Sequence, residues 1–486
     1  MVQLSTPPRP AKAPGDLREI APANGRKPLA VPFVVLLAVV FTAIGVYAMA
    51  KGLAYNQAPD AKLLANISAG DTAWVMVSAG LVMIMTPGLA FFYGGLVRKK
   101  NVLSILMQCF MLLCLISLQW ALFGYSIAFG PTQGGFVGDL SMMGLSGVGQ
   151  EPNPTYAGAI PQHVFMVFQM MFAVITPGLI IGAFAERMKF SAFCVFTLLW
   201  ATLVYDPVAH WVWGAGGFMG CLPDPVTGAK GWGSLDFAGG TVVHVNAGVA
   251  ALATALVLGK RQGYPQGRIS PPHNLPVAVL GASLLWLGWF GFNAGSALGA
   301  NGLAASAFVA THLGAAAAGF AWSLLDWWKH GKPTTLGMIT GAVAGLVAIT
   351  PAAGFVTPMG AIVIGLLAGL ICWLSVTFMK TKLGYDDSLD AFGVHGVGGI
   401  FGALATGLFA TVAVNSAGAD GLFYGNPAQL WVQTKAVLVT IGYSFVVSYV
   451  LLKVLDKLMG LRVADHDERV GLDLTQHKEA AYTVIE

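Results

Sequence analysis

Two histidines lie in glycine-rich apolar segments of this chain, and their type and surroundings suggest chemistry. His244 ends the stretch DFAGGTVVH, which begins at Asp236, and His395 ends the stretch DAFGVH, which begins at Asp390. An ionisable group in a segment of membrane-spanning length is costly to bury and usually faces a pathway or a bundle interior. A neutral imidazole offers one hydrogen-bond donor and one acceptor, and it exchanges protons near neutral pH. The pair could therefore relay a proton or hold a small polar guest.

The composition predicts that these histidines lie in a polytopic helical membrane protein. Of the 486 residues, 56% are hydrophobic and 10% are charged, whereas a soluble domain carries about 25% charged residues. The 62 glycines suit membrane helices that pack closely through small residues. Long unbroken apolar runs favour helices over the short alternating segments of a barrel. No patch is typical of nucleic-acid binding, and no His/Cys spacing indicates a metal.

Apolar runs of spanning length recur eleven times, and about 20 apolar residues cross a bilayer core. Alternate loops hold twelve basic residues and the opposite loops between spans hold only Lys230, which predicts that the basic loops and the C-terminus are cytoplasmic. The first of the eleven spans then begins outside. The runs lie near 72–94, 102–130, 163–185, 191–217, 239–259, 275–299, 303–328, 336–353, 357–379, 391–415 and 429–455.

An odd number of spans favours two inverted halves of five helices plus one extra helix. The histidines are 151 positions apart (395 − 244), so span five would carry His244 and span ten would carry His395. Inverted repeats commonly place a substrate path at their interface near the membrane midplane. We therefore expect the two histidines to meet there.

The N-terminal segment has two interpretations. A polar, Pro-rich, basic leader precedes an apolar run of about 22 residues that ends in Ala-Met-Ala at residue 50. This ending fits a signal-peptide cleavage site, which we favour, but the length also suits an uncleaved anchor. The expected organisation is a signal peptide or anchor (1–50), an outer segment (51–71), the eleven-helix domain (72–455) and a cytoplasmic regulatory tail (456–486).

Several long motifs in order carry a family resemblance. From Thr72 to Tyr482 the chain closely resembles the ammonium transporter / methylammonium permease family, which is distantly shared with the Rh glycoproteins. A lone FGVHG would be a weak signal, but the ordered set is specific. The motifs are PGLAFFYGGL (87–96), GAFAER (182–187), DFAGGTVVHVNAG (236–248), GWFGFNAGS (288–296), FGVHG (392–396), GLRV (460–463) and ERVGLD (468–473).

The resemblance implies a transport pathway with defined parts. Phe168, Phe172, Trp213 and Ser296 would form an outer site that recruits the ammonium ion, because aromatic faces attract cations. Phe172 and Phe292 would close the pore below it, and His244 and His395 would be the twin histidines that line the pore. The ion would lose its proton, ammonia would cross the hydrophobic pore, and the histidines would relay the proton. Asp236 would support the outer site, either electrostatically or by accepting backbone N–H groups at a helix start.

The resemblance also implies where the protein works and with what. We expect an inner (plasma) membrane homotrimer for nitrogen uptake, with one pore per subunit. Its substrate would be ammonium or ammonia, with methylammonium as a further candidate. The mature N-terminus would lie outside and the C-terminus in the cytoplasm. Bacterial relatives are closed by a trimeric PII signalling protein at the cytoplasmic face, which makes such a protein a candidate partner.

Two other classes of function stay open. An ammonium sensor would use binding as its signal, but such relatives often append a signalling domain, and only about 30 residues follow the last span here. A membrane metalloenzyme would use the two histidines and two aspartates. Metal sites need three or four convergent ligands, and solitary glycine-flanked histidines do not suggest them. We expect no enzyme activity, metal or cofactor.

Overall fold

The computed structural model describes residues 30–50, 60–264 and 271–482. The chain divides into two units, residues 1–40 and 41–486. Helix α1 (Ala30–Ala50) has 21 residues and is long enough, at about 1.5 Å per residue, to span a bilayer core. The leader 1–29 and residues 51–59 lie outside the described residues, so cleavage after Ala50 stays a prediction.

The predicted fold class is confirmed, because the described spans follow the expected order. Ten helical segments are long and apolar enough to cross a membrane, and the shorter apolar helix α12 lies at the predicted eighth span. The first five spans are α3 (Ala69–Leu96), α4–η3–α5 (Val102–Gln119, Trp120–Gly124, Tyr125–Phe129), α6 (Gln162–Phe184), α7–η5–α8 (Phe190–Trp200, Ala201–Tyr205, Asp206–Trp213) and η6–α9 (Gly240–Val245, Asn246–Leu258).

The second five spans and the extra helix follow in the same way. They are α10 (Leu275–Gly295), α11 (Gly302–His330), α12 (Thr335–Ile349), α13–η7–α14 (Pro358–Leu374, Ser375–Met379, Lys380–Leu383), η8–α15 (Phe392–Gly396, Val397–Phe409) and finally α16 (Pro427–Met459). The tail forms the short helices α17 (Asp465–Val470) and α18 (Leu472–His477).

Short elements occupy the connections. Helix α2 (Ala61–Leu64) precedes the first span, and the 3₁₀ turns η2 (Lys99–Asn101), η4 (Met143–Leu145) and η9 (Leu422–Tyr424) lie between spans. Two small antiparallel hairpins, β1–β2 and β3–β4, join α5 to α6. Their strands are β1 (Thr132–Gln133), β2 (Val137–Gly138), β3 (Pro152–Asn153) and β4 (Ala157–Pro161).

Side-chain caps set the starts of several helices in the second half. Asn274, Asn301, Thr334 and Thr357 each accept a hydrogen bond from a backbone N–H in the first turn of the helix that follows. These caps satisfy donors that have no partner within the helix. Gly331 ends α11 with φ +74°, a left-handed conformation that favours glycine.

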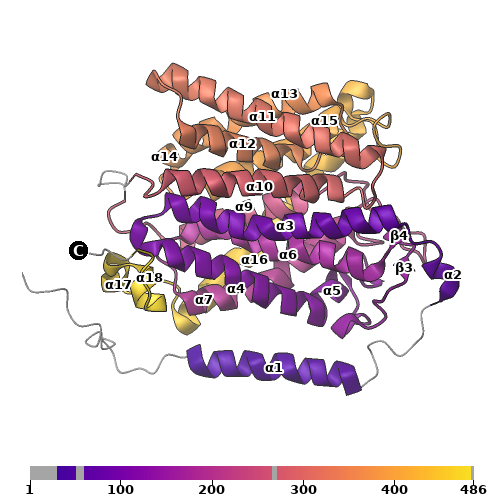
Figure 1. The fold of residues 1–486 in the computed structure, drawn as a ribbon, viewed down its shortest axis with the longest axis horizontal. Helices are drawn as coiled ribbons and strands as arrows, with labels where there is room; N and C mark the ends of the chain where they lie inside the picture. The colour runs from indigo at the N-terminus through magenta and orange to yellow at the C-terminus, as the bar shows by residue number, and fades with distance from the viewer. Residues whose placement is uncertain (1–29, 51–59, 265–270, 483–486) are drawn as a thin grey trace, which may run out of the picture. The chain divides into compact units, whose positions relative to one another are not determined.

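Small residues account for the close helix packing that the composition predicted. Helix α3 lies along α10, and α11, α12 and α13 run side by side (Figure 1). A Cβ added to Gly345 of α12 would lie 2.5 Å from the carbonyl oxygen of Gly314 on α11, and one added to Gly365 of α13 would collide with the same oxygen. Three helices therefore meet at Gly314 because none of them has a side chain there.

A buried polar pair joins two spans of the first half, and the sequence analysis did not predict it. The Gln119 amide nitrogen donates to Asp206 Oδ2 at 2.6 Å, and both side chains are fully buried. A Cβ on Gly124 would lie 3.0 Å from Asp206 Oδ2, so glycine leaves room for the pair. The π-helical turns η3 and η5 lie next to these residues in the chain. Such turns often accompany functional or strained positions.

Candidate functional site

The two histidines lie on π-helical turns that cross in opposite directions. His244 lies in η6 and His395 in η8. A Cβ on Gly248 would collide with the backbone of Gly396, and one on Gly399 would lie 2.9 Å from the Cβ of His244. Contacts that pair later residues of one helix with earlier residues of the other indicate antiparallel chains. The inverted halves therefore place their histidines side by side.

The imidazole rings share one polar contact in an otherwise apolar setting. Their Nδ1 atoms lie 3.3 Å apart, and the ring centroids are 5.3 Å apart with an interplanar angle of 21°. One nitrogen must donate and the other accept, so the two rings take different tautomers when both are neutral. His244 Nε2 is buried without a partner among the described residues. This nitrogen is available to a guest molecule in the pathway.

A small cavity lies beside the histidines inside the bundle. Its volume is about 10 Å³, about the free volume that one water-sized molecule needs. Apart from the histidines, apolar and aromatic side chains line it. The lining residues are Met85, Leu89, Phe92, Ile175, Leu179, Val243, His244, Leu285, Trp289, Phe292, Val343 and His395.

Trp289 also lines this cavity, although its residue type and position did not single it out in the sequence. Its ring stacks at 5.4 Å from the His244 ring, and its indole N–H donates to Thr350 Oγ1 at 2.8 Å. The hydrogen bond fixes the indole against the imidazole. The helical spacing of Trp289 and Phe292, which share one face of α10, is a signal that could have identified it.

Phe172 and Phe292 form an aromatic pair next to His244. Their ring centroids are 4.3 Å apart, and both side chains are buried. Phe292 also lies 6.1 Å from His244, ring to ring. The structure thus brings together the two residues expected to form the gate, directly beside the histidine pair.

The residues expected to form the outer site surround Phe172. Its ring meets Phe168 edge to face at 4.9 Å and Trp213 at 5.9 Å. Ser296 donates its hydroxyl to the Phe292 carbonyl at 2.8 Å. That bond uses the only Ser296 hydroxyl hydrogen, so the oxygen keeps lone pairs for an incoming N–H donor.

Asp236 caps the π-helical turn that carries His244. Its two carboxylate oxygens accept the backbone N–H groups of four residues at 2.6–3.1 Å. The Trp213 indole N–H donates to the Asp236 backbone carbonyl at 2.9 Å. Asp236 therefore connects the outer aromatic residue to the start of η6. Its carboxylate is occupied by backbone donors, which favours a supporting role over direct cation contact.

The second half repeats this cap with Asp387 rather than with Asp390, although Asp390 begins the DAFGVH stretch and its place before His395 suggests the counterpart of Asp236. Asp387 precedes His395 by eight residues, as Asp236 precedes His244. Its Oδ2 accepts the N–H of Phe392 at 2.7 Å, and the residue is fully buried. Asp390 instead binds the Lys380 ammonium group at 2.6 Å. The equal spacing of eight residues between each aspartate and its histidine could have identified Asp387 from the sequence.

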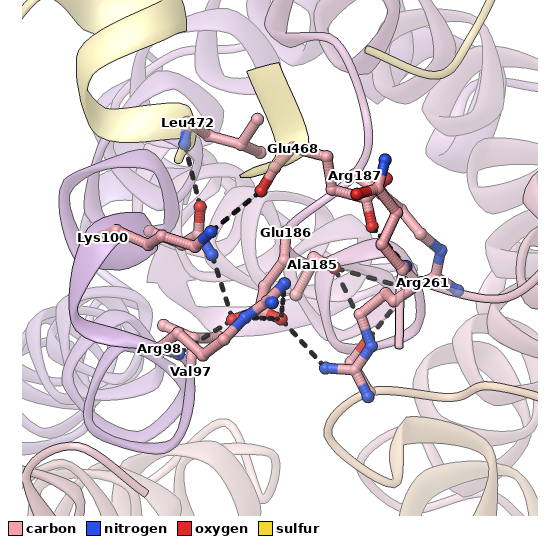
Figure 2. Close-up of polar contacts among 12 residues, drawn as sticks. Val97, Arg98, Lys100, Ala185, Glu186, Arg187, Arg261, Glu468 and Leu472 are labelled. Carbon is pink, nitrogen blue, oxygen red and sulfur yellow. Dashed lines mark hydrogen bonds and ion pairs between the residues drawn. The ribbon is translucent and has the colours of Figure 1, made fainter. Parts of the chain in front are cut away.

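An ion-pair network joins loops between the spans around Glu186 (Figure 2). Glu186 accepts hydrogen bonds from Arg98, Asn101 and Arg261, and Arg261 also pairs with Asp386 at 2.9 Å. Burial opposes the charged form of Glu186, but the bonds and charges of Arg98 and Arg261 hold its pKa below the ordinary value. The network therefore holds four connections between spans together at one end of the bundle.

The tail binds to this network. Glu468 pairs with Arg462 at 2.8 Å and accepts the Gln262 backbone N–H at 2.7 Å. Asn101, which precedes α4, accepts the N–H of Leu472, and Asp473 in turn accepts the N–H of Ser104 at 2.8 Å. The tail thus supplies the acidic cap for the start of α4.

Fold and site together define a polytopic helical membrane protein with a small apolar cavity where two inverted halves meet. The model of the Ammonium Transporter Family matches residues 73–482, and the chain belongs to that family, whose members are transporters rather than enzymes. It is 52% identical to an ammonium transporter of Bacillus subtilis, over 85% of this chain and 98% of that one. It is 48% identical to ammonium transporter Amt1 of Archaeoglobus fulgidus, over 86% and 100%.

Solved structures share the fold. The crystal structure of Candida albicans Mep2 matches with a TM-score of 0.77 and 36% identity, covering 86% of this chain and 91% of that one. A structure named Sensor Amt Protein matches with a TM-score of 0.75 and 30% identity, covering 84% and 98%. The chain is therefore a multi-span membrane protein for ammonium transport.

Proposed function

We propose that the protein recruits the ammonium ion at the outer aromatic site, removes its proton, and conducts ammonia through the pore while the twin histidines relay the proton. Phe168, Phe172, Trp213 and Ser296 would hold the ion, and Phe172 with Phe292 would gate the pore. Ammonium and potassium have the same charge and similar size. A charged pore would pass both, but an apolar pore excludes ions because stripping their water is costly. Only ammonium can cross such a pore by leaving its proton behind.

One observation carries this proposal. The cavity below the phenylalanine pair is apolar and narrow, and the His244 and His395 imidazoles are the ionisable groups that line it. Their Nδ1 atoms lie 3.3 Å apart, close enough for a proton to pass between them with small ring movements. A neutral guest fits these surroundings, and a hydrated cation does not. Because the two imidazoles interact, they would gain and lose protons as a coupled pair. A proton could pass from one ring to the other across their contact.

Trp213 provides the test of the outer site. Replacing Trp213 with leucine removes an aromatic face that attracts a cation by about 1–2 kcal/mol, so the half-saturating ammonium concentration should rise about 5- to 30-fold. The maximal transport rate should fall less, because the gate and histidines remain. Concentration series with ammonium and methylammonium in proteoliposomes measure both quantities. Trp213→Phe keeps an aromatic face and should shift less; equal shifts in the two variants would remove the cation–π role.

We propose that the protein lies in the inner (plasma) membrane with its mature N-terminus outside and its C-terminus in the cytoplasm. The unequal distribution of basic residues between alternate loops supports this orientation. Reporter fusions after Lys189 and Lys332 should report the cytoplasm. A matched fusion after Lys230, in the loop between α8 and η6, should report the outside. A reversed signal at any of the three positions would contradict the proposed orientation.

We also propose, from the family resemblance, a homotrimer with one pore per subunit and a PII signalling protein as a partner at the cytoplasmic face. The docked tail and the loop network form a surface that such a partner could bind. The relatives at 45–52% identity carry transporter names, which favours transport over the sensor alternative. For the metalloenzyme alternative, no three His, Cys, Asp or Glu side chains converge within the part of the chain that the structure describes.

A further inference from the structure

Asp206 is a buried acid inside a membrane span, and the proposed transport path does not use it. It lies seven residues before the end of the span Phe190–Trp213 (213 − 206), which is about 10 Å along the helix axis. Its side chain is fully buried, and it is not among the residues that line the cavity. A lone carboxylate at this depth is costly. Its negative charge therefore has to be neutralised by a cation or by a proton.

The groups around Asp206 are neutral or acidic. Within the described residues, its carboxyl is bonded to the neutral amide of Gln119. His210 lies one turn further along α8, with Nδ1 at 3.0 Å from the Ala128 carbonyl oxygen and Nε2 at 2.9 Å from the Thr132 hydroxyl. Both ring nitrogens are thus bound to neutral groups other than Asp206. The other titratable side chains on or beside the elements packed against α8 are Tyr125, Asp139, Tyr205 and Asp236, and none of these can carry a positive charge.

Gln119 offers the hydrogen-bonding groups that a neutral carboxylic acid needs. Its amide nitrogen donates to Asp206 Oδ2 at 2.6 Å and to the Thr202 hydroxyl oxygen at 3.3 Å. The Gln119 amide oxygen and Asp206 Oδ1 are buried without a partner in the part of the chain that the structure describes. Each of these oxygens belongs to the same planar group as an atom of the 2.6 Å hydrogen bond. A proton on the carboxyl adds the one donor that two facing acceptors lack.

The surroundings of the pair favour a proton over a larger cation. The Gln119 N–H points at the carboxyl, so its positive end would repel a cation bound there. A Cβ on Gly124 would lie 2.7 Å from Gln119 Nε2, 2.8 Å from Gln119 Oε1 and 3.0 Å from Asp206 Oδ2. Even a methyl group is therefore too large for this side of the pair, whereas a proton needs no additional space.

We propose that Asp206 binds a proton at neutral pH and forms with Gln119 a neutral acid–amide pair, which joins the second and fourth spans inside the membrane. The Asp206 O–H donates to the Gln119 amide oxygen, and the Gln119 N–H donates to the other oxygen of the acid. An exposed carboxyl is ionised at neutral pH, so the protein releases this proton when it unfolds. A folded state that holds more protons than the unfolded state loses stability as the pH rises.

Infrared spectra of the purified full chain in micelles at neutral pH test the protonation directly. The carbonyl stretch of a protonated carboxyl is well separated from the bands of a carboxylate. The parent protein should show a protonated-acid band that Asp206→Asn lacks, and Gln119→Leu should move this band to a higher frequency because the acid loses its partner. Asp236→Asn is the matched control and should keep the band, because the Asp236 carboxylate accepts four backbone N–H groups.

The pH dependence of unfolding gives a second measurement. Parent and Asp206→Asn proteins would be unfolded by denaturant in micelles between about pH 6 and pH 8. One proton released on unfolding lowers the ratio of folded to unfolded protein about tenfold for each pH unit. The parent should show this additional loss relative to Asp206→Asn, since asparagine keeps a neutral pair that does not titrate. Ammonium transport by Asp206→Asn should stay at the parent rate, because the pair lies outside the cavity lining.

Three results would overturn the proposal. If Asp206→Asn removes no protonated-acid band, or if the two proteins unfold with equal pH dependence, Asp206 does not hold the proton. If the parent protein is stabilised by sodium or potassium over choline and Asp206→Asn is not, a bound cation neutralises the acid. A band that does not move in Gln119→Leu would show that the acid has another partner. If Gln119→Leu fails to fold, the spectrum and the pH dependence of Asp206→Asn still decide whether the proton is present.

Discussion

Replacing both His244 and His395 with alanine is expected to reduce ammonium-driven current to background. The imidazoles are the ionisable groups in the cavity lining, and their contact at 3.3 Å joins the two halves of the relay. Alanine leaves an apolar pore through which neutral ammonia can diffuse but no group that carries the proton. Charge movement should therefore stop while an uncharged ammonia flux persists.

Current recording on reconstituted protein, with a pH-sensitive dye inside the vesicles, separates these two fluxes. The double-alanine variant should show dye alkalinisation without current. Ordinary ammonium current and ordinary selectivity in this variant would contradict the proton relay and would leave the pair as pore lining only.

His244→Asp tests selectivity at the same position. A carboxylate in the cavity would attract cations and hold water, which lowers the cost of bringing an ion into the apolar path. We expect a potassium current that the parent protein lacks, together with retained ammonium current. His244→Asn, of similar size and uncharged, is the matched control and should stay closed to potassium. Equal potassium conduction by both variants would assign the leak to lost packing.

Gly248→Ala is a further change for which we expect a large effect. The added Cβ would collide with the backbone of Gly396 and lie 2.9 Å from the His395 carbonyl carbon. Backbone atoms cannot rotate away, so η8 must move, and overpacking of this kind costs about 1–3 kcal/mol or more. The movement would also separate the imidazoles. We expect a lower unfolding temperature in detergent and loss of most ammonium current.

Gly442→Ala is the matched control, because no atom lies within 4 Å of a Cβ built on Gly442 in α16. Alanine favours a helix over glycine by about 1 kcal/mol, so this variant should be as stable as the parent protein and fully active. Normal stability and current in Gly248→Ala would show that the two histidine helices can separate without loss of function.

The spans could be predicted from the sequence because their physical cause is local. A bilayer core demands about 20 consecutive apolar residues, and the basic residues collect in alternate loops between the spans, so length and charge placement were enough. The histidines were identifiable because their ionisable side chains interrupt apolar segments. Ordered motifs then pointed to Phe172, Phe292 and Trp213, and the structure brings these rings together near the histidines.

The partners of polar and aromatic groups depended on packing between distant segments, which no local pattern encodes. Trp289 on α10 contacts His244 on η6, and Gln119 at the end of α4 meets Asp206 at the start of α8. Asp387, rather than Asp390, caps η8 because the chain turns at Asp390 with a positive φ. Apolar length and charge placement are properties of consecutive residues, whereas hydrogen-bond partners come from segments that are distant in the chain. The sequence by itself therefore determined the spans and the histidines, and tertiary packing decided which groups they meet.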